Sequence, residues 1–113
     1  RRRPMPSYCA PPEEARRLQI FPGVEIQTLA GEGLMLSLVV MEPGAVVERH
    51  AHPHEQMGML LEGELTFTIG EETRTLHPGE MWRIPGGVPH GATAGPAGCR
   101  ALDLFHPVRE DYR

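Results

Sequence analysis

Apolar and polar residues alternate along most of this chain in short runs that end at glycine or proline. In residues 65–69 the apolar side chains occupy every second position, which is the period of a strand with one buried face. Residues 34–42 are almost continuously apolar, as expected of a strand buried on both faces. Pro-Gly pairs at 43–44 and 78–79 predict turns. The pattern therefore predicts an all-β chain.

The remaining strands are predicted from the same signals. They cover residues 23–29, 46–52, 56–61, 73–76, 81–84, 90–94 and 99–105. Turns are expected at 62–64 and 70–72, and a loop is expected at 95–98. Short strands at this even spacing are typical of a sandwich or a barrel.

Residues 1–22 lack a regular period and are expected to form an N-terminal arm. Within this arm, residues 11–18 start with proline, continue with acidic residues and end with arginine. That order is compatible with a short helical turn, because it matches the helix dipole. A chain of 113 residues supports one hydrophobic core, so residues 23–113 are expected to form a single barrel domain.

Composition narrows the classes of partner. The chain has 11 Lys+Arg against 15 Asp+Glu and contains no lysine, which argues against a general nucleic-acid binder. No apolar stretch approaches the ~20 residues needed to span a bilayer, and no signal-peptide pattern is present. The two cysteines, Cys9 and Cys99, are far apart and are expected to be free thiols. We therefore expect a cytoplasmic protein without a nucleic-acid or membrane partner.

Four residues are candidate metal ligands. His50 and His52 are two positions apart, so on a strand both imidazoles lie on the same face. Gln56 offers an amide oxygen from the next strand, and His90 comes from a distant segment. Three imidazoles and one oxygen leave coordination positions open, which is typical of a catalytic metal site. A histidine pair alone is more often a surface or core feature, and the surrounding glycine and proline framework favours the metal interpretation.

The C-terminal segment carries a second group of candidates. On a strand, Asp103 and Phe105 share one face. If that face is the barrel interior, a carboxylate and an aromatic ring line the same pocket as the metal. Arg109 follows shortly afterwards, and its guanidinium group is suited to bidentate binding of a carboxylate. The alternative is an edge strand with a solvated charged tail, and the pattern alone does not decide between them.

Two spacings in the chain resemble a known family. Residues 44–63 follow G-x5-H-x-H-x3-Q-x6-G and residues 79–90 follow G-x5-P-x-G-x2-H, which are similar to the two cupin motifs. The resemblance implies a small single-domain cupin of the double-stranded β-helix, or jelly-roll barrel, fold with a metal inside. This chain has Gln56 where the family usually has Glu, and Ala94 where it often has Asn. Glu55 is expected on the opposite strand face, so it ranks behind Gln56 as fourth ligand.

A further resemblance concerns a smaller group of cupins. HPHEQ at residues 52–56 and D-x-F-x-P-x-R-E-D at residues 103–111 resemble the KdgF-type pectin-degradation cupins. This implies an enzyme that opens the ring of 4,5-unsaturated uronate monosaccharides, from pectin and alginate breakdown, to linear keto sugars. It also implies metal ligation by three histidines and a glutamine, with the matching aspartate, phenylalanine and arginine handling the substrate. These roles fall on His50, His52, Gln56 and His90, and on Asp103, Phe105 and Arg109.

The expected cofactor is one divalent transition metal, and the ligand set admits Ni, Zn, Mn or Fe. The expected partner is a small carboxylate or sugar acid. An open edge strand and the arm also predict a homodimer, formed by strand exchange or sheet packing. Other functions stay open, because a fold does not fix a reaction. They are another metal-dependent cupin (a dioxygenase or a sugar isomerase), a non-catalytic small-molecule-binding module, and a structural or storage protein, which would leave the histidines unexplained.

Overall fold

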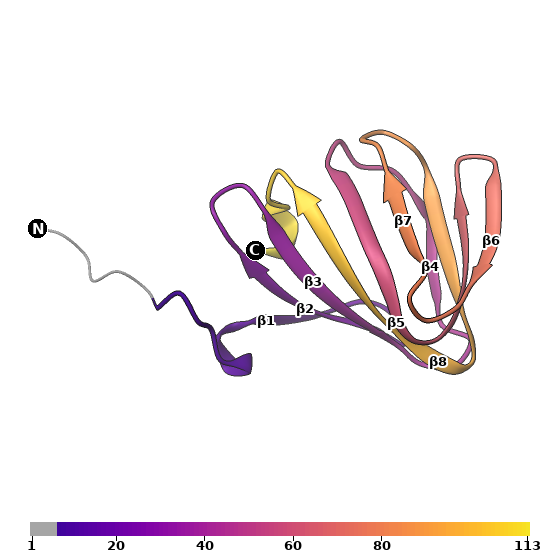
Figure 1. Ribbon diagram of the computed structural model, residues 1–113, viewed down its shortest axis with the longest axis horizontal. Helices are drawn as coiled ribbons and strands as arrows, with labels where there is room; N and C mark the ends of the chain where they lie inside the picture. Colours follow the sequence, from indigo (N-terminus) through magenta and orange to yellow (C-terminus); the bar gives the residue numbers. More distant parts are fainter. Residues whose placement is uncertain (1–6) are drawn as a thin grey trace, which may run out of the picture.

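A computed structural model describes residues 7–113, in which eight strands and two short 3₁₀ helices are formed (Figure 1). In chain order they are η1 Pro12–Glu14, β1 Arg16–Phe21, β2 Val24–Ala30, β3 Met35–Met41, β4 Val46–His50, β5 Glu55–Ile69, β6 Glu72–Leu76, β7 Met81–Ile84, β8 His90–His106 and η2 Glu110–Tyr112. Neither helix in this part of the chain is long and apolar enough to cross a membrane.

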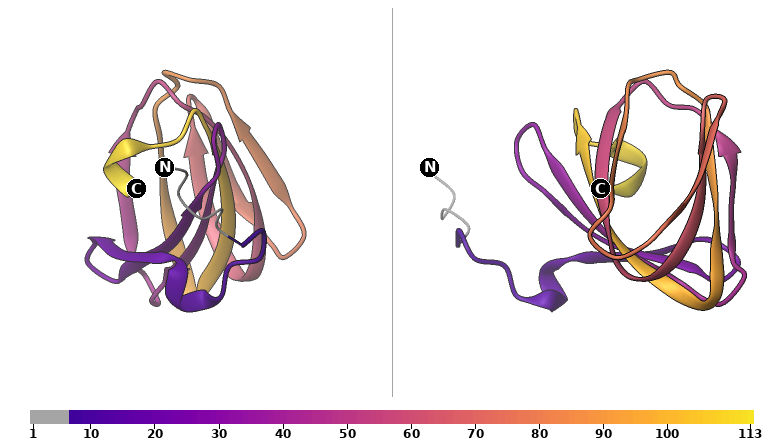
Figure 2. Two further views of the ribbon diagram at one scale, coloured as in Figure 1. Left: turned by 90° about the vertical axis from the view of Figure 1, so that its left-hand side faces the viewer. Right: turned by 45° about the vertical axis from the view of Figure 1, so that its right-hand side comes forward.

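Two long strands, β5 and β8, organise the molecule. They pair antiparallel along almost their whole length, and the shorter strands join different halves of each. The first half of β5 also pairs with β7 and its second half with β6, while β8 pairs first with β4 and then with β3. Strands β2 and β1 extend the sheet beyond β3. The two halves curve around a common interior (Figures 1 and 2), which confirms the predicted all-β jelly-roll fold.

The turns predicted at 62–64 and 95–98 are wrong, because β5 and β8 continue through both segments. Gly63 and Gly98 have φ angles of 81° and 73°, in the region where a side chain is strained. A Cβ atom on Gly63 would also overlap the carbonyl group of Gly98. The pairing register shifts on both sides of Gly63. These glycines therefore bend the paired strands at a barrel corner instead of ending them.

The N-terminal region contains a strand that the sequence pattern did not predict. The expected helical turn at 11–18 is reduced to η1, and β1 follows directly and pairs with β2. Leu18, Ile20 and Phe21 of β1 pack against the core from the edge of the sheet. Ahead of β1 the chain leads away from the barrel (Figure 2). Residues 1–6 of the expected arm lie outside the described residues.

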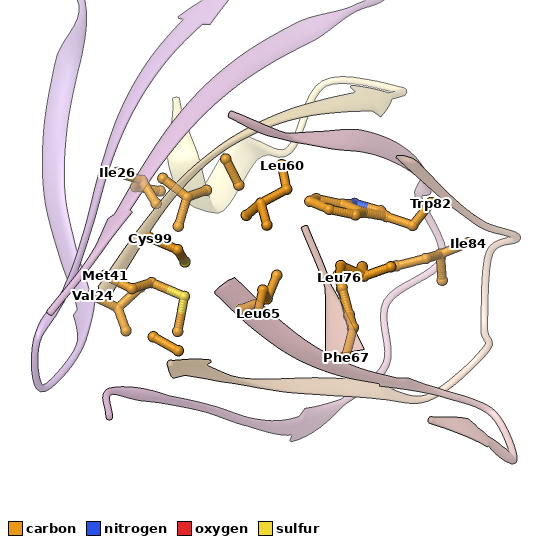
Figure 3. Close-up of a cluster of buried hydrophobic side chains, with 13 residues drawn as sticks. Val24, Ile26, Met41, Leu60, Leu65, Phe67, Leu76, Trp82, Ile84 and Cys99 are labelled. Atoms are coloured by element: carbon orange, nitrogen blue, oxygen red, sulfur yellow. The ribbon is translucent and has the colours of Figure 1, made fainter. Parts of the chain in front are cut away.

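Inward-pointing residues of β2, β3, β5, β7 and β8, together with Leu76 of β6, form the core (Figure 3). The ring centroids of Trp82 and Phe67 lie 5.1 Å apart at 61°, an edge-to-face arrangement that aromatic pairs favour. Cys99 is buried in this core, and burial raises the pKa of its thiol to about 11. Cys9 is exposed, and both cysteines are free thiols.

Candidate metal centre

The structure brings the three predicted histidines together at one end of the barrel interior. His50 ends β4, His52 follows it, and His90 begins β8, where it pairs in register with His50. One ring nitrogen of each histidine lies within 4.8 Å of the others. Gln56 of β5 is buried beside them, whereas Glu55 is exposed. Strand alternation therefore directs Gln56, and not Glu55, toward the histidines.

Each imidazole is oriented by the backbone. The Nδ1 atom lies against a carbonyl oxygen two residues away, at 2.8 Å for His50, 3.1 Å for His52 and 2.9 Å for His90. A carbonyl oxygen only accepts hydrogen bonds, so Nδ1 carries the proton in each ring. The lone pair then lies on Nε2, the tautomer that a metal-binding histidine needs.

The Nε2 atoms have surroundings that fit a cation. His90 Nε2 is buried and has no hydrogen-bond partner in the described chain, and burial lowers the pKa of His90 to about 4. His52 Nε2 lies 3.0 Å from Gln56 Oε1, so two lone pairs face each other. Burial, together with Arg109, lowers the pKa of His52 and disfavours a proton between them. Two ligand atoms that bind one metal ion at about 2.0–2.1 Å, at right angles to each other, lie about 3 Å apart. The donor set therefore fits a divalent ion.

Asp103 lies in a row of residues that crosses β8, β5 and β7. It pairs in register with Gly58, which pairs in turn with Trp82. The Trp82 indole N–H donates to Asp103 Oδ1 over 2.9 Å. Gly58 makes this bond possible, because a Cβ atom there would collide with both side chains. The glycine therefore leaves the space through which the tryptophan reaches the carboxyl group.

Burial raises the pKa of Asp103 to about 6, although hydrogen bonds from Gln56 and Trp82 and the charge of Arg109 act in the opposite direction. The Gln56 amide thus has two neighbours: its oxygen faces His52, and the amide also lies close enough to Asp103 to lower the pKa of that carboxyl group. Since one amide touches both groups, the carboxyl group and the metal site are parts of one network.

Phe105 and Arg109 lie on the same side of the interior. The Phe105 ring meets the His52 ring edge-on, with centroids 5.8 Å apart. The guanidinium carbon of buried Arg109 lies 3.9 Å from the Tyr112 ring centroid and 5.1 Å from that of Phe105. Its Nε and Nη2 donate to the two carboxylate oxygens of Asp111 over 3.2 and 2.7 Å. The sequence predicts that Arg109 binds a carboxylate of the substrate, and in this structure its guanidinium group binds the carboxylate of Asp111 instead.

A cavity of about 60 Å³ connects these groups. Six of the seven predicted residues line it: His50, Gln56, His90, Asp103, Phe105 and Arg109. Ser37, Trp82 and Tyr112 line it too, and the sequence analysis did not identify them. A glycine at 58 within an apolar strand is the one sequence signal that pointed to a close approach there.

Comparisons with known proteins agree with this geometry. A family model described as "Cupin domain" matches residues 37–105. A solved RmlC-like cupin from Shewanella frigidimarina is 29% identical with a TM-score of 0.86, and the match covers 96% of this chain and 97% of that chain. The structure of KdgF from a Halomonas species is 32% identical with a TM-score of 0.79, over 88% of this chain and 92% of that chain.

A further relative is a transcriptional regulator. The HTH-type transcriptional regulator PuuR of Escherichia coli is 35% identical over 69 residues, which are 59% of this chain and 37% of the regulator. The chain therefore spans well under half of that protein's length, and the likeness concerns one part of it.

The geometry predicts that Gln56, and not Glu55, is the fourth ligand. We expect one divalent ion per chain in the wild type, at least tenfold weaker binding in Gln56→Ala, and unchanged binding in Glu55→Ala. Metal analysis and competition with a chelator measure the affinities. Equal weakening in both variants would contradict the assignment.

The space at Gly58 predicts a second effect. Gly58→Ala forces Trp82 or Asp103 to move, and we expect it to lower the free energy of unfolding by about 1–3 kcal/mol. Gly31→Ala is the matched control, because a Cβ atom there makes only an ordinary contact, and its effect should stay within about 0.5 kcal/mol. Urea unfolding compares the two, and similar values for both variants would exclude the steric role.

Proposed function

The chain belongs to the cupin family, and from this premise we propose that it is a metal-dependent enzyme that opens the ring of a 4,5-unsaturated uronate monosaccharide. One observation carries the proposal: a buried carboxyl group with a pKa of about 6, held by the Trp82 indole, lines the same cavity as His50, Gln56 and His90 of a neutral donor set. The likeness to KdgF along most of both chains supports the same proposal.

The reaction is an isomerisation and needs no oxidant. The substrate is a cyclic enol ether that carries a carboxylate next to the ring oxygen. Its anomeric hydroxyl group loses a proton as the bond between C1 and the ring oxygen breaks, which leaves an aldehyde at C1 and an enolate at C5. The enolate gains a proton at C4 and becomes a ketone. One proton leaves and one is added, so the product is a linear keto sugar of the same composition.

Asp103 is the residue that moves the proton. A carboxyl group with a pKa of about 6 both accepts and donates a proton near neutral pH, as a general acid–base catalyst requires. The Trp82 indole fixes one of its oxygens and leaves the other lone pairs of the group available. Asp103 therefore takes the hydroxyl proton or delivers the proton to C4.

The other residues bind and orient the substrate. A divalent ion at His50, His52, Gln56 and His90 supplies Lewis acidity toward a carboxylate or ring oxygen when bound. Arg109 neutralises the substrate carboxylate. This carboxylate takes the place of Asp111, which is largely exposed, at the guanidinium group. Phe105 packs between these groups and limits the access of water to them.

Asp103→Asn tests the proposed proton transfer. Asparagine keeps the size of the side chain and an oxygen for Trp82, but it does not titrate. We expect kcat to fall at least 100-fold while the metal content stays the same. The decrease of enol-ether absorbance with unsaturated galacturonate measures the rate in metal-loaded protein.

Glu62→Gln is the control for that substitution, because Glu62 is an exposed carboxylate paired with Arg100, and it should leave kcat unchanged. Full activity of Asp103→Asn would exclude the proton-transfer role. A wild-type protein that opens no ring with any of the four candidate metals would exclude the proposed function.

The likeness to part of a transcriptional regulator supports a second candidate, a non-catalytic module that binds a small acid in the same cavity. Recovery of an unsaturated uronate, tightly bound but unchanged, would favour it over the enzyme. Oxygen uptake by the Fe(II)-loaded protein would instead indicate a dioxygenase. A cytoplasmic location and the lack of a nucleic-acid ligand stay predictions from composition.

We also infer that the molecule forms a homodimer through the outer face of β3, β8, β5 and β7. Outward-pointing apolar side chains form two rows in register across four strands: Leu36, Leu104 and Met57, then Leu38, Leu102, Met59 and Met81. Four of them are more than a third exposed: Leu36, Met57, Met81 and Leu104. A contiguous apolar patch of this kind marks an interaction surface, and a second copy supplies a self-complementary one.

Leu102→Glu places a charge at the centre of this patch without entering the barrel interior. We expect the wild type to have twice the chain mass of 12.5 kDa and Leu102→Glu to have the chain mass itself. Val46→Glu introduces the same charge at an exposed position of β4 and should remain dimeric. Light scattering after size exclusion measures the masses, and a monomeric wild type would contradict the inference.

A further inference from the structure

Ser37 is a buried polar residue without a partner. Its side chain on β3 is 1% exposed, and its Oγ has no hydrogen-bond partner in the described chain. Ser37 also lines the cavity that contains the metal ligands and Asp103. Leaving a buried hydroxyl group unpaired costs free energy, so a group that enters the cavity is its natural partner.

The neighbours of Ser37 do not supply that partner. In the row that crosses the sheet, Ser37 pairs in register with Thr28 on one side and with Asp103 on the other. The Thr28 hydroxyl group donates a hydrogen bond to the Tyr112 carbonyl oxygen over 2.7 Å. Asp103 accepts a hydrogen bond from the Trp82 indole N–H. The Thr28 hydroxyl group and one oxygen of Asp103 are therefore engaged by other groups, and neither residue is bonded to Ser37.

We propose that Ser37 and Asp103 form a subsite that binds one hydroxyl group of a polyhydroxylated acid. Residues directly opposite on neighbouring strands have Cβ atoms about 4.5–5.5 Å apart, which leaves room for one oxygen atom between short side chains. The ligand hydroxyl group accepts a hydrogen bond from Ser37 and donates one to Asp103. Ser37 then selects ligands that carry a hydroxyl group there, because analogues without it leave Ser37 unpaired.

This subsite rests on the proposed function, since it assigns part of the same substrate, but it is tested by binding and not by turnover. The probe is D-galacturonate, which has no C4–C5 double bond and so does not undergo the enol-ether ring opening. Its 2-deoxy and 3-deoxy analogues each lack one hydroxyl group. Calorimetry on the metal-loaded full chain gives the dissociation constants.

We expect the wild type to bind galacturonate about 3- to 10-fold more tightly than one of the two deoxy analogues, the effect of one neutral hydrogen bond. Ser37→Ala should lose this preference and bind all three ligands alike. Ser37→Cys, which keeps the size but is a weak hydrogen-bonding group, should lose most of it. Ser7→Ala makes the same change at the other serine, which is exposed, and should keep it.

Stability separates this role from a structural one. Ser37→Ala removes a hydroxyl group that has no partner, so the melting temperature of the ligand-free protein should not fall. The subsite is excluded if the wild type does not bind galacturonate, if it binds both analogues as tightly, or if Ser37→Ala weakens all three ligands by one factor. If the hydroxyl preference is found while unsaturated galacturonate is not opened, the subsite stands and the proposed reaction fails.

Discussion

The antiparallel pairing of β5 with β8 brings together residues that are between about 20 and about 50 positions apart in the chain. Its register places Gln56 beside Phe105 and Gly58 beside Asp103. The second half of the same pairing sets Ile69 against His90, so the same two strands carry the acid and one of the candidate metal ligands. A shift of one residue would turn every inward side chain outward. The register shifts on both sides of Gly63, and the glycines at the barrel corner let both strands bend while they stay paired.

Charge is distributed unevenly over the site. Three imidazoles and an amide are neutral ligands, so they do not reduce the charge of a bound ion as a glutamate would. Asp103 is a buried carboxyl group that lines the same cavity as this set, and burial raises its pKa to about 6. Arg109 is buried beside an aromatic ring and paired with Asp111. The guanidinium charge of Arg109 is therefore already paired with a carboxylate of the same chain.

Sequence reasoning predicted most of the fold but misplaced some boundaries for identifiable reasons. Gly63 and Gly98 were interpreted as turn residues, because a glycine within a short segment usually ends a strand. In the folded chain they face each other across one ladder, and only their pairing shows that the strands continue. Strand β1 was not predicted, because its mixed sequence has no period and its stability comes from pairing with β2 at the sheet edge.

The sequence by itself determined most of the strand pattern, the family spacing and the face of its strand on which Gln56 lies, whereas His52, which was predicted within a strand, lies beyond the end of β4. These are local properties, set by the two-residue period of a strand and by glycine and proline at fixed offsets. Only the tertiary structure decided that Trp82 reaches Asp103 across Gly58, that Arg109 binds Asp111, and that Ser37 is left without a partner. Each of these features depends on how side chains fill a shared interior, and strand periodicity contains no information about that.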